Sequence, residues 1–265
     1  GNFEVDYKIH GFEDLHLHAS LGAQYTSTQQ SDEISKYSYS NNYFGWAGMT
    51  HYWKYNMIGN AYAQYAHKFG VHDIDVMAGA EQSHYHRHGY NQGFGTDEYL
   101  KANNPVLNEE TGYYNWQHNP SKRSEQEWAN HNSLVSYFGR LNYNLLDRYL
   151  ITATFRADGS SRFAKGHKWG YFPSAAFAWK INHEGFLKDV KWLDDLKLRV
   201  GWGKTGQQNG IDDFYYAPLY VVGNSYAQYP FGNDYHQTVR PNKYNDKLTW
   251  EKTTTWNAGI DFAAL

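Results

Sequence analysis

The chain has 265 residues and contains 25 Tyr, 14 Phe and 10 Trp, yet its mean hydropathy is only −0.80. Its longest uninterrupted apolar run, Ala175 to Trp179, is far shorter than the roughly 20 residues that a transmembrane helix needs. A formal net charge of −3 excludes a general nucleic-acid binder, and the absence of Cys excludes disulfides, thiol catalysis and thiolate metal sites.

Alternation of apolar and polar residues dominates the sequence and predicts β-strands with two different faces. In the first strand, Phe3, Val5 and Tyr7 alternate with charged residues. The pattern recurs about nine times, in segments that run from Phe3 to Ile9, Leu15 to Tyr25, Trp53 to His67, Ile74 to Ala80, Tyr137 to Leu145, Tyr149 to Ala157, Ala175 to Ile181, Leu196 to Trp202 and Trp256 to Phe262. Several segments exceed the ~5–6 residues usual for globular strands, which argues against an ordinary sandwich.

The predicted connections alternate between short and long. The short ones lie near His10-Gly11, Lys68 to Gly70 and Leu146-Asp147, and a larger one with a helical turn runs from Asn182 to Asp195. The long ones are rich in aromatic and polar residues and run from Thr26 to Trp46, Tyr85 to Asn132, Gly159 to Trp169 and Thr205 to Trp250. Short periplasmic turns at one end and long extracellular loops at the other are typical of an outer-membrane β-barrel.

Aromatic residues near the strand ends fit the interfacial girdles of such a barrel: Trp53, Tyr65, Tyr137, Tyr149, Trp179 and Trp202. The alternative is a soluble antiparallel β protein whose apolar face packs on a second sheet. Strand length and loop asymmetry favour the barrel. The predicted fold class is all-β, with antiparallel strands that form part of a transmembrane outer-membrane β-barrel.

Four blocks in the second half of the chain resemble a known family. They are Asp147 to Phe163 (DRYLITATFRADGSSRF), Trp169 to Ile181, Trp192 to Gln208 and Leu248 to Phe262. Their sequences and order closely resemble the barrel of the SusC/RagA family of TonB-dependent outer-membrane transporters from Bacteroidetes-type bacteria. The blocks cover roughly residues 133 to 262, and residues 1 to 132 fit as preceding barrel strands and loops.

This resemblance implies an outer-membrane location in a Gram-negative cell. Residues 1–265 are then expected to be one segment of the receptor barrel domain, without the plug domain. The implied function is TonB-dependent import of oligosaccharides or peptides. The implied partners are outer-membrane lipid, a glycan or peptide ligand, a SusD-like surface lipoprotein over the extracellular loops, and TonB through the plug. The alternative functions are a soluble carbohydrate-binding β domain and a β-structured hydrolase.

Three features could suggest an enzyme, but none has the spacing that catalysis needs. Ser160 lacks a Gly-x-Ser-x-Gly elbow and an assignable His partner. Gly203 to Thr205 lacks the upstream glycine spacing of a phosphate-binding loop. Adjacent carboxylates such as Asp194-Asp195 point to opposite sides of a strand, whereas a glycosidase needs both at one bond. We therefore expect no enzymatic activity and no cofactor.

A His-x-His-x-His motif is the candidate metal site. On a strand, His84, His86 and His88 would share one face, a spacing that can bind Zn or Cu. Glu81 is close, but the sequence fixes no carboxylate ligand. With 14 His in the chain, exposed loop histidines are the preferred interpretation, so no metal is expected.

Aromatic residues in the predicted loops are the candidate ligand-binding residues. Tyr and Trp can stack on sugar faces and favour interfaces in general, while neighbouring amides bond hydroxyls. Glycan contact, packing against a partner lid and loop self-packing all remain open for these positions. The candidates are Tyr43, Trp46, Trp116, Trp128, Tyr215, Tyr216 and Tyr235.

Overall fold

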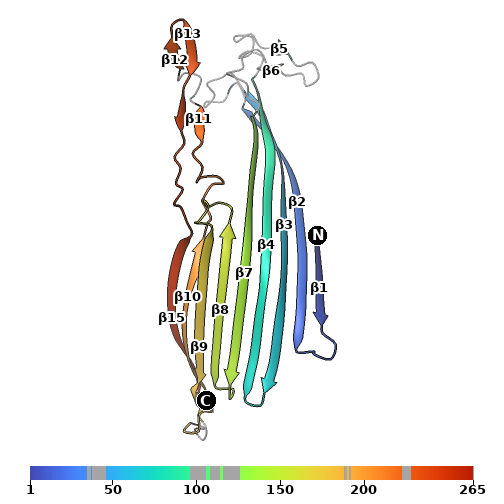
Figure 1. Cartoon of the computed structure of the whole chain (residues 1–265), viewed down its shortest axis with the longest axis vertical. Coiled ribbons are helices and arrows are strands. Elements are labelled where there is room, and N and C mark those ends of the chain that lie inside the picture. Colours follow the sequence, from blue (N-terminus) through green and yellow to red (C-terminus); the bar gives the residue numbers. More distant parts are fainter. Residues whose placement is uncertain are drawn as a thin grey trace.

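A computed structural model describes residues 1–34, 37, 46–95, 106–107, 114–115, 126–187, 190, 192–222 and 228–264. In these residues a nine-stranded antiparallel sheet has the order β1-β2-β3-β4-β7-β8-β9-β10-β15 (Figure 1). The strands are β1 Asn2–Lys8, β2 Leu15–Ile34, β3 Trp46–Phe69, β4 His72–Gly95, β7 Gln126–Leu145, β8 Tyr149–Ser160, β9 Trp169–Lys180, β10 Leu193–Gln207 and β15 Glu251–Ala264. The predicted antiparallel all-β class is confirmed.

Short strand pairs lie in the connections at one end of the sheet. They are β5 Val106–Leu107 with β6 Tyr114–Asn115, β11 Tyr220–Val222 with β14 Val239–Pro241, and β12 Gln228–Phe231 with β13 Asp234–Gln237. A 3-10 turn, η2 Ile181–His183, follows β9. Within the described residues, no helix has the length and apolar character required to cross a membrane.

The tight turns join neighbouring strands at the end opposite the long loops, as predicted (Figure 1). Gly70 (φ +59°) lies between β3 and β4. Leu146 and Asp147 both have positive φ, 58° and 53°, which is the backbone of a two-residue type I′ turn that matches the twist of a β-hairpin.

The predicted loop boundaries at Thr26, Tyr85 and Asn132 are wrong, because β2, β4 and β7 continue beyond the alternating pattern. β3 and β4 each have 24 residues, and β4 and β7 stay paired from His72 opposite Leu145 to Asn91 opposite Gln126. In the parts of β4 and β7 nearest the long loops, both faces of the sheet carry polar side chains, so the alternation of apolar and polar residues fades. Backbone pairing across strands needs no apolar face, and the ladder therefore continues.

Cross-strand register separates the side chains into two faces. The apolar face carries Phe3, Leu21, Met57, Val76, Leu141, Phe155, Phe177, Val200 and Ile260, all more than a third exposed. All six predicted girdle aromatics also lie on this face. The polar face carries Glu4, His18, Asn60, Glu81, Asn142, Arg156, Ser174 and Asn257.

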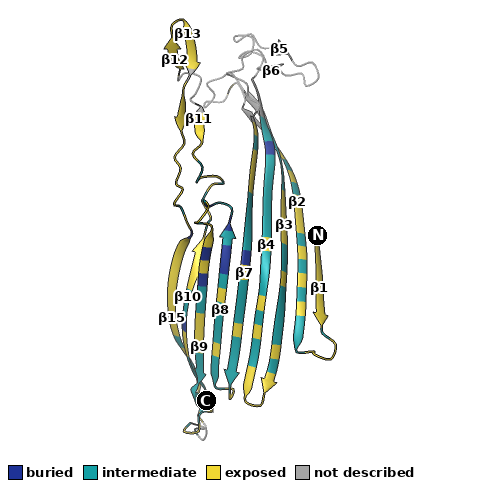
Figure 2. Ribbon diagram, viewed as in Figure 1, coloured by how far each residue is buried: buried dark blue, intermediate teal, exposed yellow. Residues whose placement is uncertain are grey.

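The buried core is small and lies where two long loops meet β9. Phe163, Phe172 and Trp250 are at most 7% exposed, and their rings pack at centroid distances of 5.5 Å and 5.4 Å from Trp250. The Trp250 indole N–H donates to the Lys168 carbonyl at 2.9 Å. Figure 2 shows that buried residues concentrate on β8 and β9. This cluster fixes the loops to the sheet.

Candidate functional site

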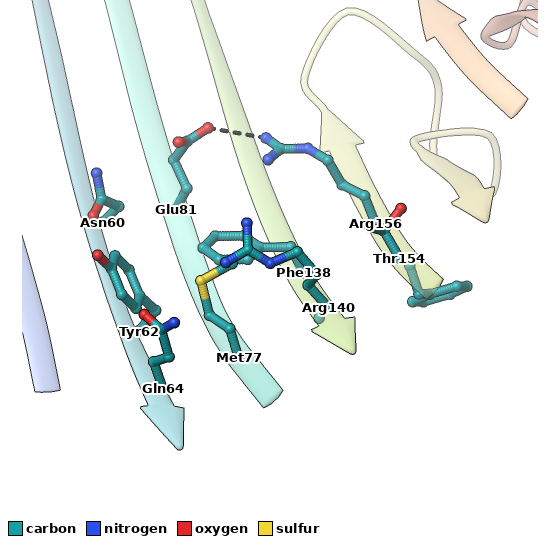
Figure 3. Close-up of a pocket in the computed structure, with 11 residues that line it drawn as sticks. Asn60, Tyr62, Gln64, Met77, Glu81, Phe138, Arg140, Thr154 and Arg156 are labelled. Atoms are coloured by element: carbon teal, nitrogen blue, oxygen red, sulfur yellow. Dashed lines mark hydrogen bonds and ion pairs between the residues drawn. The ribbon is translucent and has the colours of Figure 1, made fainter. Parts of the chain in front are cut away.

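A pocket of about 500 Å³ lies on the polar face, across β3, β4, β7 and β8 (Figure 3). The register between these four strands brings the lining residues side by side on the polar face. Its lining combines amides, a hydroxyl, charged groups and a few apolar side chains: Asn60, Tyr62, Gln64, Met77, Glu81, Phe138, Arg140, Thr154 and Arg156 among them. Such a surface can hydrogen-bond a polar ligand or a polar protein segment.

Arg156 organises one side of this pocket. Its Nη2 donates to Glu81 Oε1 and to Ser136 Oγ, each at 2.9 Å, and its Nε donates to Asp158 Oδ1 at 2.7 Å. Ser136 is fully buried and Asp158 is 7% exposed. The guanidinium also lies 5.8 Å from the centre of the Phe138 ring. Because β4, β7 and β8 each contribute a partner, these bonds fix the spacing of three strands.

A chain of hydrogen bonds crosses the polar face closer to the turns. Gln64 Nε2 and Asn142 Nδ2 donate to the two oxygens of Asp75, at 3.0 and 3.4 Å. Thr152 Oγ1 donates to Asn142 Oδ1 at 3.0 Å. Arg140 differs, since its buried Nε has no hydrogen-bond partner among the described residues. The pocket wall thus contains one buried, unpaired donor beside a satisfied network.

Ser160, the candidate nucleophile, has no catalytic base beside it among the described residues. Ser160 is 1% exposed, and its Oγ accepts a bond from the Arg162 backbone N–H at 3.2 Å. No His contacts Ser160 in the described part of the chain. Arg162 itself bonds Asp213 Oδ1 at 3.1 Å and the Gln208 carbonyl at 3.3 Å. The Asp-Gly-Ser-Ser-Arg-Phe segment therefore anchors loops and has no catalytic geometry.

The predicted ligand-binding residues fall into three groups. Tyr43 and Trp116 lie outside the described residues, and the side chain of Trp46, the first residue of β3, does also. Tyr215 and Tyr216 lie in the connection after β10, and Tyr235, in β13, is 69% exposed. No ring contact joins Tyr215, Tyr216, Tyr235 and Trp128 to one another in the residues that the structure describes.

Trp128 was expected in a loop, and that placement is wrong. It lies in β7 on the polar face, where the Arg87 guanidinium sits 4.5 Å from its ring and 4.2 Å from the ring of Tyr52. Its indole Nε1 donates to Asn91 Oδ1 at 3.5 Å. Trp128 thus belongs to an aromatic and cationic wall at the loop end of the polar face.

His84, His86 and His88 were also expected in a loop, and they instead lie in β4. They share the face that carries the apolar residues, where Met57 lies opposite His84 and Trp53 lies opposite His88. His84 Nδ1 is 2.7 Å from Ser133 Oγ, and His88 Nε2 is 2.8 Å from Glu127 Oε1. The three imidazoles do not converge on one point; in the described part of the chain, the group with ligand atoms within 4.8 Å is Glu4, Asp6 and His18.

The sequence did not single out Arg156, Glu81, Asp75 and Arg140 as site residues. A signal was available, since alternation assigned Arg156 and Asp158 to the polar side of their strand. Which polar residues meet across β4, β7 and β8 depends on register, and the apolar pattern alone does not fix the register between strands separated by a long loop.

A long-stranded antiparallel sheet with one exposed apolar face, one hydrogen-bonded polar face and turns opposite long loops is the wall of an outer-membrane β-barrel. A family model described as TonB dependent receptor-like, beta-barrel, matches residues 1–264. The chain belongs to this family of outer-membrane transport receptors, which is not enzymatic.

Individual relatives agree with this family. The chain is 53% identical over 265 residues, all of its length, to the TonB-dependent receptor SusC of Bacteroides thetaiotaomicron, of which it spans 25%. It is 30% identical over 210 residues to the TonB-dependent receptor P3 of Formosa agariphila, covering 78% of this chain and 20% of the relative. The chain thus spans about a quarter of the length of SusC.

Solved structures match in fold. A structure of the RagAB peptide transporter aligns with TM-score 0.74 at 22% identity, over 95% of this chain and 26% of that chain. The RagAB peptide importer in its closed-closed state aligns with TM-score 0.76 at 22% identity, over 99% of this chain and 27% of that chain. The barrel wall is confirmed; closure of a barrel is not seen in the described sheet.

Proposed function

We propose that residues 1–265 form one segment of the barrel of a SusC/RagA-type TonB-dependent importer. The observation that carries the proposal is the two-faced sheet within a chain that matches this family from end to end. The apolar face contacts lipid, and the polar face, with the pocket around Arg156, lines the interior through which substrate passes. The outer membrane is the location that the family gives.

The proposed substrates are oligosaccharides or peptides, taken up with energy from TonB acting on a plug. SusC is the relative with 53% identity, and the RagAB structures are named for a peptide transporter. The wall formed by Tyr52, Arg87 and Trp128 supports contact with either substrate, because rings stack on sugars and a guanidinium bonds carbonyls or carboxylates. A SusD-like surface lipoprotein is the proposed partner over the loops that hold Tyr215, Tyr216 and Tyr235.

The alternative of a soluble carbohydrate-binding domain has less support. Its apolar face would need a covering sheet, and Tyr137, Phe155 and Ile260 are 55%, 51% and 69% exposed in the described structure. A hydrolase is unsupported because the described residues of the polar face assemble no catalytic pair.

Uptake measured with the full-length transporter in its own host tests the proposal. Labelled oligosaccharides and peptides of graded length are supplied with and without a protonophore, since TonB-driven import requires the proton gradient. Import of either class that stops with the protonophore supports the proposal. Equal uptake in the strain that lacks the transporter would contradict it.

Variants then locate the path of the substrate. Trp128→Ala should lower uptake or raise the half-saturating concentration of substrate, because it removes a ring from the polar wall. Tyr171→Ala is the matched control, since Tyr171 is an aromatic residue 54% exposed on the apolar face. If both variants behave alike, Trp128 does not face the substrate.

A further inference from the structure

Five imidazoles gather on the apolar side of the sheet, close to Trp53 of β3, which lies directly opposite His88. Register places Tyr55, His86 and His131 in one row, with each residue directly opposite the next on β3, β4 and β7. His84 and His88 stand two residues to either side of His86 on β4. His51, two residues from Trp53 on β3, completes the set.

His86 and His131 differ from the other three because neither forms a hydrogen bond with a described residue. Their rings face each other at 26° with centroids 6.5 Å apart. The Tyr55 ring stacks on His86 at 5.1 Å, and the Phe214 ring meets His131 edge-on at 5.1 Å. Aromatic rings therefore flank both imidazoles, and the imidazole nitrogens stay available.

His84 is turned toward the same strand as His131. Its Nδ1 lies 2.7 Å from Ser133 Oγ, on β7, and this contact leaves Nε2, the outer nitrogen, without a partner among the described residues. A metal-binding imidazole is usually supported by a hydrogen bond from its other ring nitrogen to a carboxylate, a backbone carbonyl or water, and the Ser133 hydroxyl occupies this position at His84. His88 differs, because its Nε2 is already paired with Glu127 Oε1 on β7 at 2.8 Å, while its ring stacks with Trp53 on β3 at 5.8 Å.

The charge of this surface favours a cation over an anion such as a lipid phosphate. In the rows from Tyr25 to Gln29, His51 to Tyr55, His84 to Tyr90 and Glu127 to Ser133, the apolar-side face carries the carboxylate of Glu127 and no Lys or Arg. Lys54 and Arg87 alternate onto the polar face, where the Arg87 guanidinium lies over the rings of Tyr52 and Trp128.

We propose that His84, His86 and His131 bind a divalent transition metal ion, Zn²⁺ or Cu²⁺, on the outer wall of the barrel. Two imidazoles at alternate positions of one strand and a third on the neighbouring strand supply the three-nitrogen set that suits these ions. His84 and His86 are half-buried and His131 is exposed, and rotation about their side-chain bonds brings their nitrogens to the ~2.0–2.1 Å that an ion requires. Solvent completes the coordination. This site is independent of the proposed import function.

Isothermal titration of the full-length transporter tests the site. The protein carries no His tag, is stripped with a chelator, and is titrated in detergent with Zn²⁺ alone and with Cu²⁺ alone. The expected result is one ion bound per barrel. His86→Ala and His131→Ala should each weaken binding by more than about tenfold, and His84→Ala by about tenfold, since even supporting residues of metal sites have effects of this size.

Two control variants separate this site from the remaining metal-binding groups of the chain. His88→Ala, on the same strand and face, should leave affinity within about twofold, because Nε2 of His88 is already occupied by Glu127. Asp6→Asn alters the competing group of Glu4, Asp6 and His18 on the polar face. Loss of binding in Asp6→Asn with full binding in His86→Ala would overturn the proposal, as would no binding of either ion.

A second measurement guards against unfolding. Each variant is first compared by heat-modifiable migration on gels, which reports an intact barrel. Electron paramagnetic resonance of bound Cu²⁺ should show coupling to several nitrogens, and this coupling should decrease in folded His131→Ala. A spectrum of oxygen ligands alone would also overturn the proposal.

Discussion

The apolar and polar faces of the sheet share one backbone but differ in what holds their side chains. On the apolar face, Phe3, Tyr137 and Phe262 are 68%, 55% and 61% exposed, so their packing partners must come from the surroundings. On the polar face, Arg156 and Asp75 bind partners from neighbouring strands of the same sheet. Side chains of the apolar face therefore depend on lipid for their packing, whereas those of the polar face depend on the register between strands for their hydrogen bonds.

The largest expected effect comes from charging the apolar face. Ala175→Arg on β9 should destabilise the barrel by about 2–4 kcal/mol, the cost of an arginine facing lipid near the bilayer midplane, since Ala175 lies midway between Tyr171 and Trp179 on the apolar face. The matched control is Ala176→Arg, since Ala176 is the next residue and faces the polar side. The folded fraction in outer-membrane preparations, read from heat-modifiable migration, measures both. Equal losses would show that the two faces do not differ in their environment.

The second-largest expected effect comes from Gly79, a tightly packed glycine on the polar face. A Cβ at Gly79 would lie 2.5 Å from Tyr62 Cβ and 2.6 Å from the Ala61 carbonyl oxygen, which belongs to backbone and cannot move aside. Gly79→Ala should therefore cost about 1–3 kcal/mol, as overpacking typically does.

Gly139→Ala is the matched control for this prediction. A Cβ at Gly139 meets nothing nearer than the Met77 carbonyl oxygen at 3.6 Å. Urea midpoints of the two purified variants, refolded into vesicles, give the comparison. A Gly139 variant as unstable as the Gly79 variant would indicate that loss of glycine, and not the clash, is responsible.

The sequence predicted the two faces well and the contacts between strands poorly. All nine long strands and the alternation of turns and loops follow from the period of two, because lipid contact requires an apolar residue at every second position. The upper parts of β4 and β7 were missed because His84 to Gly95 and Gln126 to Asn132 carry polar groups on both faces. Arg156 meeting Glu81, 75 residues away, depends on a register that no local pattern contains.

Removing one partner of the Arg156 network gives a smaller effect. Arg156→Met leaves Glu81 and Asp158 without their cation, and breaking a fully buried pair would cost ~3–5 kcal/mol. The side chains of Arg156 and Glu81 are 37% and 25% exposed, so water weakens the effect to about 1–2 kcal/mol.

Arg199→Met is the control for the Arg156 variant. Arg199 bonds Asp261 at 2.6 Å but is 54% exposed, so its loss should cost less than about 1 kcal/mol. Urea unfolding of both variants measures the difference. A larger loss in Arg199→Met would contradict the view that burial on the polar face sets the strength of these pairs.

The smallest expected effect lies at the turns, outside both faces. Glu184 follows η2 and accepts hydrogen bonds from Tyr149 Oη at 2.6 Å, Trp179 Nε1 at 3.0 Å and Arg148 Nη1 at 3.1 Å. These bonds, led by that from Tyr149, hold the pKa of Glu184 below its usual value. A carboxyl group whose pKa is lowered by folding stabilises the fold above its unfolded pKa, and this stabilisation disappears as the pH falls through the folded pKa.

Glu184→Gln should therefore lower the thermal midpoint at neutral pH, and this difference should begin to shrink near the ordinary pKa of glutamate, about 4.3, and disappear as the pH falls through the lower pKa of the folded state. The control is Glu13→Gln, because Glu13 lies in the turn between β1 and β2 and bonds no described residue. Thermal unfolding in detergent at several pH values measures both variants. A difference between Glu184→Gln and the parent that persists unchanged in acid would mean that the lost shape of the side chain, and not its charge, stabilises this turn. If the difference between Glu184→Gln and the parent instead vanishes in acid, the ionised carboxylate of Glu184 stabilises this turn, whereas the apolar face depends on lipid.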